Sequence, residues 1–483
     1  MSSSAKPTGS YRHILRYTGL FGSVQALSVV LSVVRNKLTA LFIGTVGMGL
    51  ADLYMRTADL VGQGTNFGIA FSAVRRLAAL AGTGHQRAAA LYARVVRTWT
   101  LLAAALGAAV CVAASPLISM TAMGSASSWP AFALLAPVVA FTTLSGGEMA
   151  ILKGLRRLRA LATASVVTAL LTLLFTAPLY ALWGLAGILP ALNLSALGAY
   201  VAMRYAATRA LPWRPAPLSG GFLRAGRGML GLGLAYVGAG IMGAGAELAV
   251  RLGLLHSGGT QGTLGLYAAG FTLTVSYARL VFTAMDADYF ARLSAAMSQR
   301  GTMNTTVNRQ TDVLVLLIVP FLLAFALALP LLVRLLYTAQ FADVIPMVIC
   351  ASGYMYFKAL FSPSAYLPLA AGHSWTYMWM ELTYDLFFAT AVIAGYALGG
   401  LAGAGLGLTL GGAFNYLLVR LVYRRRYGLR TSRAVAGRAL WMGLLLAAGL
   451  ASAFAPWPAL RWSVGVATLL TSALLALVFF RKA

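Results

Sequence analysis

Residues Gly47 to Arg76 read GMGLADLYMRTADLVGQGTNFGIAFSAVRR, and the middle of this stretch is long and apolar enough to cross a lipid bilayer. It nevertheless contains three charged residues followed by two amides. In order they are Asp52, Arg56, Asp59, Gln63 and Asn66, at successive offsets of four, three, four and three residues. Such offsets place all five side chains on one face of a single helix.

The charged side chains of this face cannot point at lipid. A charge at the centre of a membrane helix costs about 2.5–3.5 kcal/mol on the insertion scale. The face must therefore line an interior surface that is packed against other helices or wet. Two interpretations are open: a self-neutralising ladder of Asp52, Arg56 and Asp59 that only holds helices together, or a translocation cavity inside a helix bundle.

The composition indicates that the whole chain, and not only this stretch, belongs to a membrane protein. Hydrophobic residues make up 60% of the 483 residues and charged residues only 10%, with a mean hydropathy of +0.81. These values exclude a soluble globular domain. Apolar runs of about 20 residues favour helices over a β-barrel. The two cysteines, Cys111 and Cys350, both lie in apolar runs, so no disulfide framework is expected.

The order of the apolar runs predicts an all-α polytopic membrane protein of about 14 transmembrane helices. We expect an N-terminal lobe of helices 1 to 6 (1–208), a cytoplasmic linker (209–228), a C-terminal lobe of helices 7 to 12 (229–430) and accessory helices 13 and 14 (431–483). The linker is assigned from its proline-rich, polar sequence.

The basic residues predict the topology. Of the 37 lysines and arginines, 29 fall in segments assigned to the cytoplasm, five in periplasmic segments and three within helices. This distribution predicts a bacterial inner-membrane protein with both termini cytoplasmic. Arg35 and Lys37 belong to the periplasmic loop expected between helices at 16–34 and 47–73. The net charge of +27 is therefore expected to meet anionic phospholipids and not nucleic acid.

The two halves of the chain share a glycine motif. The segment Gly44–Leu50 (GTVGMGL), before helix two, is echoed by Gly259–Leu266 (GTQGTLGL), before helix eight at 265–289. Helix eight also has a polar face, formed by Thr272, Ser276, Arg279, Thr283 and Asp286. An even number of helices per repeat predicts two lobes related by an axis along the membrane normal, with the site between them.

Other helices also contain polar groups. Gln25 shares a face of helix one with serines, Glu148 could pair with Lys153, and Glu247 with Arg251 four residues later reads as a structural ion pair.

Glu381 and Asp385 lie four residues apart within one apolar helix. Their mutual repulsion suits a proton or sodium site, and the alternative is a pair satisfied by Lys358 or by interfacial water. Nine of the ten acidic residues lie in or at the ends of predicted helices, and only Asp343 lies in a loop.

No motif of catalysis is found. The four histidines have no metal-ligand spacing, and the chain contains neither a phosphate-binding loop nor a nucleophile elbow. Gly403, Gly407 and Gly411 recur every four residues, which is typical of close helix packing in membranes. We therefore expect no enzyme, no metal and no cofactor.

Several short motifs resemble those of Wzx-type oligosaccharide-lipid flippases of the MOP (multidrug/oligosaccharidyl-lipid/polysaccharide) exporter superfamily. They are Gly47–Leu50, Asn66–Ile69, Ser72–Arg76, Val281–Met285, Asp288–Ser294, Phe341, Gly353, Lys358, Glu381 and Gly403–Gly407. The resemblance implies two six-helix lobes that form a V-shaped central cavity, and fourteen helices is the number expected of the lipid-flipping branches. It also implies that helices 13 and 14 form a groove for the lipid tail.

The chain departs from the family pattern at two positions. Ala291 stands where many relatives have proline, and Tyr354 stands where many have an acidic residue. The second departure removes a possible partner of Lys358, which would leave this lysine freer for an anionic ligand.

The hypothesis is an alternating-access flippase that moves an undecaprenyl-diphosphate-linked glycan to the periplasmic leaflet for surface polysaccharide (O-antigen type) assembly. A diphosphate and hydrated sugars must cross about 30 Å of hydrocarbon. Arg56, Arg279 and Lys358 are expected to bind the diphosphate through charge-assisted hydrogen bonds, and Arg35 and Lys37 to receive it.

The remaining candidate residues fall into two groups. Those expected to line the cavity and bind sugars are Gln25, Gln63, Asn66, Ser276 and Tyr354. Those expected to couple transport to H+ or Na+ are Asp52, Asp59, Asp286, Glu381 and Asp385.

Further expected partners are a polysaccharide polymerase or glycosyltransferases. Two alternatives remain. A cation-coupled multidrug exporter would need carboxylates without competing buried cations, whereas a non-transporting subunit of a polysaccharide synthase would have polar faces that are all paired internally.

Overall fold

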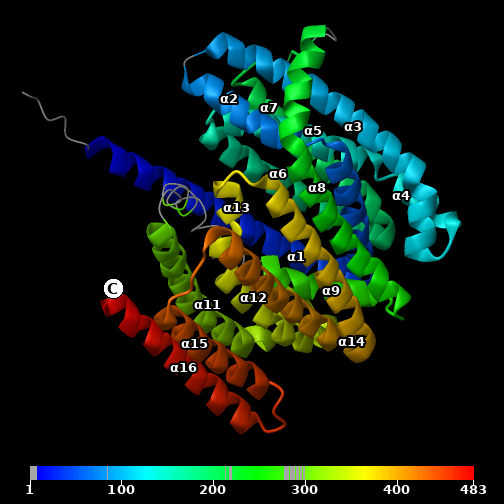
Figure 1. The fold of residues 1–483 in the computed structure, drawn as a ribbon. Helices are drawn as coiled ribbons and strands as arrows, with labels where there is room; N and C mark the ends of the chain where they lie inside the picture. The colour runs from blue at the N-terminus through cyan, green and yellow to red at the C-terminus, as the bar shows by residue number, and fades with distance from the viewer. Residues whose placement is uncertain are drawn as a thin grey trace, which may run out of the picture. The chain divides into compact units, whose positions relative to one another are not determined.

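A computed structural model describes residues 8–83, 85–212, 214–216, 220–276, 282, 289, 293, 296 and 300–482, and Figure 1 shows its fold. Every regular element among these residues is a helix. Arg279, Asp286 and most of the motifs at 281–294 lie outside the described residues, as do the side chains of Gln25 and Ser276.

The chain forms two compact units. Unit 1 comprises Met1–Ile43 and Thr57–Val237, and unit 2 comprises Gly44–Arg56 and Gly238–Ala483. Helix α1 (Thr8–Thr65) contributes residues to both units, and so does α8 (Gly220–His256).

Unit 1 is built around packed helices. After α1 its elements are α2 (Ile69–Gly82), α3 (Gln86–Met123), η1 (Ala126–Ser128), α4 (Trp129–Ala133), α5 (Ala136–Gly154), α6 (Leu158–Trp183), η2 (Gly184–Gly187) and α7 (Ile188–Thr208). Helix α5 packs against α2, α3 and α7. Helix α3 ends at Gly124, whose φ of 67° favours glycine, and α5 begins with a proline in its first turn.

Unit 2 contains the remaining helices. They are the later part of α8, α9 (Gln261–Phe271), the π-helical turn η3 (Thr272–Ser276), α11 (Arg300–Leu336), η4 (Ala339–Val344), α12 (Ile345–Ala365), α13 (Leu367–Ala370), α14 (Ser374–Tyr427), α15 (Arg433–Ser452) and α16 (Pro458–Lys482). Helix α12 packs against α14 and α11, and α15 lies beside α16 (Figure 1). Local capping defines two starts, since the side chains of Thr260 and Ser432 accept backbone hydrogen bonds at the first turns of α9 and α15.

The hydropathy of these helices confirms a multi-pass membrane protein. Within the described part of the chain, ten segments are long and apolar enough to cross a membrane. The segment Leu158–Thr208 contains both α6 and α7, and α14 has non-helical backbone at Gly399 and Gly400. The predicted number of about fourteen helices stays a prediction.

Two local predictions about the first part of the chain are wrong. Residues 35–43 are helical instead of forming a loop, and the two predicted helices are separated only by a kink at Gly44, with φ 62° and ψ −163°. The helix then ends at Thr65, so Asn66 does not continue the helical face of Asp52 to Gln63. The reason is local, because the Asn66 side chain accepts a hydrogen bond from the Gly68 amide at 2.8 Å and so competes with the helix.

The two similar glycine motifs contact each other within unit 2. A Cβ atom added at Gly265 would lie 1.9 Å from the carbonyl oxygen of Thr45. One added at Gly49 would lie 2.0 Å from the carbonyl oxygen of Gln261. The backbones of α1 and α9 therefore touch, and only glycine allows this approach.

Gly265→Ala is expected to lower the free energy of unfolding by about 3 kcal/mol, because the added methyl group would overlap backbone atoms that cannot rotate away. The measurement is the thermal unfolding midpoint of the detergent-solubilised protein. Gly437→Ala in α15 is the control, since no atom lies within 4 Å of the added Cβ. Equal stability of the two variants would show that the helices do not cross this closely.

Candidate functional site

Four charged side chains of α1 and α8 form an ion-pair network inside unit 2. Arg56 lies 3.3 Å from an oxygen of Asp52 and 2.6 Å from an oxygen of Glu247. Arg251 lies 2.9 Å from the other oxygen of Asp52 and 3.7 Å from Glu247. The predicted pair of Glu247 and Arg251 is confirmed. The network as a whole joins two cations to two carboxylates.

Arg251 is the most deeply buried member of this network. Its side chain is 0% exposed, and its guanidinium carbon lies 5.2 Å from the ring centroid of Tyr267 and 5.6 Å from that of Phe271. The π-faces and the carboxylates together replace the water that the cation has lost. Arg56 is more open, with 29% of its side chain exposed, but a diphosphate bound there would have to compete with both carboxylates.

Lys358 on α12 has a different environment. Its Nζ atom lies 5.6 Å from the ring centroid of Phe282 and 5.8 Å from that of Tyr354. The hydroxyl of Tyr384 donates to that of Tyr354 at 3.2 Å. Lys358 belongs to none of the ion pairs formed by described residues. Its charge is near that of Glu381 on α14, which in turn is hydrogen-bonded to Tyr377.

Asp385 lies one turn after Glu381 on α14 and is buried. Its Oδ2 atom has no hydrogen-bond partner among the described residues. A Cβ atom added at Gly243 of α8 would lie 3.8 Å from this oxygen. A buried carboxylate without a partner is costly unless it takes up a proton or binds a cation. In the described part of the chain no cluster of three His, Cys, Asp or Glu residues could hold a metal ion.

Unit 1 contains a small polar cavity of about 160 Å³. Three of its lining residues are predicted site residues: Asp59, Gln63 and Asn66. The others are Ala58, Gly62, Ile69, Ala70, Thr100, Thr142, Thr143, Gly146 and Gly147, so that no aromatic side chain is among the residues that line it.

The hydrogen bonds of this cavity leave polar groups available. The amide nitrogen of Asn66 donates to the Gln63 side-chain oxygen at 3.3 Å, so Gln63 keeps its own amide donors. Thr100 and Thr142 each donate to a backbone carbonyl one turn earlier, at 2.7 and 2.8 Å. A hydroxyl that has donated its hydrogen still has lone pairs, so both threonines can accept hydrogen bonds from a ligand.

A buried ion pair lies next to the cavity. Arg97 of α3 binds Glu148 of α5 through two hydrogen bonds of 2.9 and 3.0 Å, and the two side chains are 3% and 4% exposed. Arg97 also donates to the carbonyl oxygen of Pro212 at 2.7 Å. The prediction that Glu148 pairs with Lys153 is wrong. Lys153 is exposed, whereas the planar guanidinium of Arg97 matches both carboxylate oxygens.

Arg35 and Lys37 lie on the helical part of α1 that belongs to unit 1, and both are half-buried. Arg35 donates to the side chain of Asn36 at 3.4 Å.

The threonines that line the unit 1 cavity are not among the site residues predicted from the sequence. A signal for Thr142 and Thr143 was present, because residues 142–147 read TTLSGG within a predicted membrane helix.

Comparisons with known proteins agree with this architecture. The sequence profile of a family described as "Polysaccharide biosynthesis protein" matches residues 84–346. No curated protein matches the chain in sequence.

Among solved structures, the lipid II flippase MurJ in an inward closed conformation is similar, with a TM-score of 0.68 and 14% identity over 96% of this chain and 99% of that chain. An inward-facing multidrug resistance MATE family transporter of the MOP superfamily is also similar, with a TM-score of 0.66 and 14% sequence identity. The match covers 87% of this chain and 99% of that chain. A MOP superfamily transporter from Pyrococcus furiosus has a TM-score of 0.55 and 15% sequence identity, and the match covers 85% of this chain and 94% of that chain. The predicted all-α membrane transporter fold is thereby confirmed.

Proposed function

The chain belongs to the polysaccharide biosynthesis protein family, and we propose that it is an alternating-access flippase for a polyprenyl-diphosphate-linked oligosaccharide. The proposed direction is from the cytoplasmic to the periplasmic leaflet of a bacterial inner membrane, for assembly of a surface polysaccharide. Such a substrate has sugar hydroxyls and a diphosphate, and each must keep polar partners across about 30 Å of hydrocarbon.

The unit 1 cavity is the observation that supports this function most directly. Asp59, Gln63, Asn66 and the threonine hydroxyls give it both donors and acceptors inside an apolar helix bundle. Sugar hydroxyls need both kinds of partner, because each donates one hydrogen bond and accepts others. We propose that this cavity replaces the water around one or two sugar rings.

Lys358 is the proposed partner of the diphosphate. Of the predicted cations within helices, Arg56 is held between Asp52 and Glu247, and Arg279 lies outside the described residues. Lys358 is half-buried among aromatic rings and, in the part of the chain that is described, belongs to no ion pair. A lysine in such surroundings gains strongly from a phosphate oxygen because little water competes.

Ion coupling is proposed to involve Asp385 and Glu381. The unsatisfied oxygen of Asp385 and the neighbouring carboxylate favour uptake of H+ or Na+, and release of that ion would reset the cycle.

A cation-coupled multidrug exporter is the second candidate, because the fold is shared with MATE transporters and Asp59 supplies a carboxylate to the cavity. Large apolar cations favour aromatic walls, which the residues lining this cavity do not provide. A synthase subunit with fully paired polar faces fits less well, because Asp385 is left unsatisfied among the described residues.

Lys358→Met is expected to slow flipping of a fluorescent short-chain prenyl-diphosphate oligosaccharide in proteoliposomes by about 10-fold or more, because a hydrogen bond to a charged group contributes about 1.5–3 kcal/mol. Gln63→Ala should slow it less, because a neutral hydrogen bond contributes about 1 kcal/mol. Rates are measured with and without proton or sodium gradients.

Lys153→Met is the matched control, since Lys153 is exposed and the same charge is removed. Its rate should equal that of the wild type. Transport of cationic drugs but of no glycan by folded wild-type protein would favour the exporter. Equal rates for Lys358→Met and Lys153→Met would remove Lys358 from the proposed site.

A further inference from the structure

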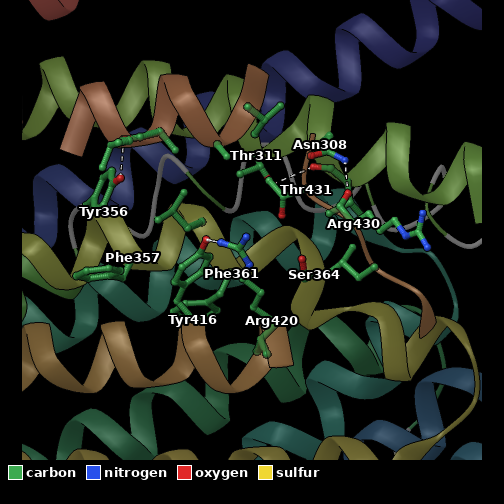
Figure 2. Close-up of a pocket in the computed structure, with 18 residues that line it drawn as sticks. Asn308, Thr311, Tyr356, Phe357, Phe361, Ser364, Tyr416, Arg420, Arg430 and Thr431 are labelled. Atoms are coloured by element: carbon green, nitrogen blue, oxygen red, sulfur yellow. Dashed lines mark hydrogen bonds between the residues drawn. The ribbon is translucent and has the colours of Figure 1, made fainter. Parts of the chain in front are cut away.

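Unit 2 contains a second cavity, of about 340 Å³, among α11, α12, α14 and the first turns of α15 (Figure 2). Most of its wall is apolar or aromatic. Among the lining residues of this kind are Val307, Phe357, Leu360, Phe361, Val419 and Ala436. None of the residues proposed above for transport lines it.

The polar side chains of this cavity are mostly engaged with the protein. The Asn308 side chain donates to the carbonyl oxygen of Arg430 at 2.8 Å and accepts from the Ser432 amide at 3.0 Å. Thr311 donates to a backbone carbonyl one turn earlier at 2.9 Å. Tyr356 donates to a carbonyl oxygen of α15 at 2.7 Å. The interior therefore offers few groups for sugars and suits a hydrocarbon chain.

Cationic side chains adjoin this apolar interior. Arg420, which donates to the Tyr416 hydroxyl at 2.8 Å, and Arg430 line the cavity itself (Figure 2). An adjoining cavity of about 420 Å³ shares Asn308 and Arg430 with it and adds Arg309. Arg438 is also there, but it is paired with Asp312.

Arg309, Arg420 and Arg430 are exposed, and no ion pair of the described residues includes them. Their charge is therefore available to an anion. An apolar cavity of this size with unneutralised cations at its edge fits a ligand that has a hydrocarbon chain and an anionic head.

We propose that this cavity binds an anionic phospholipid, with one acyl chain inside it and the phosphate on Arg430 and Arg420. The distribution of basic residues predicts that this end of α14 lies at the cytoplasmic face, where anionic headgroups are found. The proposal is independent of the transported substrate. A lipid-linked glycan is disfavoured here because most of the lining side chains are apolar or aromatic.

The test is native mass spectrometry of the detergent-solubilised protein, titrated with phosphatidylglycerol and, separately, with phosphatidylcholine. Each arginine near an anionic headgroup contributes to the binding free energy, and the loss of one arginine should raise the dissociation constant about 5-fold. Arg420→Gln with Arg430→Gln should therefore weaken phosphatidylglycerol binding about 30-fold, and it should weaken phosphatidylcholine binding less, because the choline cation already neutralises that lipid's phosphate. Arg425→Gln, which removes an exposed charge outside the cavity, should leave both affinities unchanged.

A second variant tests the acyl chain. Ala436→Leu fills part of the apolar wall and keeps every arginine, so it should weaken binding of both lipids. The proposal is overturned if the double glutamine variant binds phosphatidylglycerol as tightly as Arg425→Gln does. It is also overturned if a prenyl diphosphate displaces phosphatidylglycerol from the wild type but not from Ala436→Leu, because the cavity would then belong to the transported lipid.

Discussion

Arg251→Met is expected to lower the free energy of unfolding by about 3 kcal/mol, because it leaves two half-buried carboxylates with one cation between them. Arg251 is fully buried and contacts both Asp52 and Glu247. The remaining Arg56 cannot replace it, since Arg56 already contacts the same two carboxylates. In a thermal melt of the detergent-solubilised protein we expect the midpoint to fall by about 5 °C.

Arg424→Met is the control for this variant, because it removes the same charge from an exposed position. Its midpoint should stay within about 1–2 °C of the wild type. Adding Asp52→Asn to Arg251→Met should restore part of the lost stability, since the carboxylate that Arg251 would have paired is then also removed. An Arg251→Met protein as stable as the control would mean that the network contributes nothing to folding.

Glu148→Gln is expected to destabilise unit 1 by a similar amount, about 3–5 kcal/mol, because the guanidinium of Arg97 then stays buried without its carboxylate. The pair is almost fully excluded from solvent, with side-chain exposures of 3% and 4%. The expected result is a lower unfolding midpoint and lower yield of folded protein. Asp343→Asn makes the same chemical change at an exposed position and should be neutral.

The double variant Arg97→Met with Glu148→Met tests why Glu148→Gln is destabilising. It separates the cost of leaving Arg97 buried without its carboxylate from the net contribution of the ion pair. Replacement of a buried ion pair by apolar side chains of similar size is often neutral. We therefore expect the double variant to be more stable than Glu148→Gln alone. A double variant that is less stable than the single would show that the pair itself, with its contact to the Pro212 carbonyl, stabilises unit 1.

For several polar residues, spacing along one helix was enough to predict which side chains lie together. Helix periodicity placed Asp52 and Arg56 one turn apart, and they form an ion pair. The same spacing paired Glu247 with Arg251. It also put Asp59 and Gln63 on one face, and both line the unit 1 cavity. Periodicity failed at Asn66, whose side chain hydrogen-bonds the following turn and ends the helix.

The structural class of the protein could be predicted from its composition and its apolar runs. Backbone groups in a membrane are satisfied only in helices or closed barrels, and apolar runs of about 20 residues are too long and too uniform for barrel strands, so composition and run length were sufficient to predict an all-α membrane protein. Charges inside those runs had to face the interior for the same reason.

Which charged side chains form ion pairs between helices depends on how the helices pack. Arg97 and Glu148 are 51 residues apart, and Asp52 and Arg251 are 199 residues apart. Spacing along the chain carries information only about one helix face, because partners three or four residues away are the ones that helical geometry brings together. Partners on different helices are selected by packing, as at Gly49 and Gly265, where the absence of a side chain lets two backbones touch.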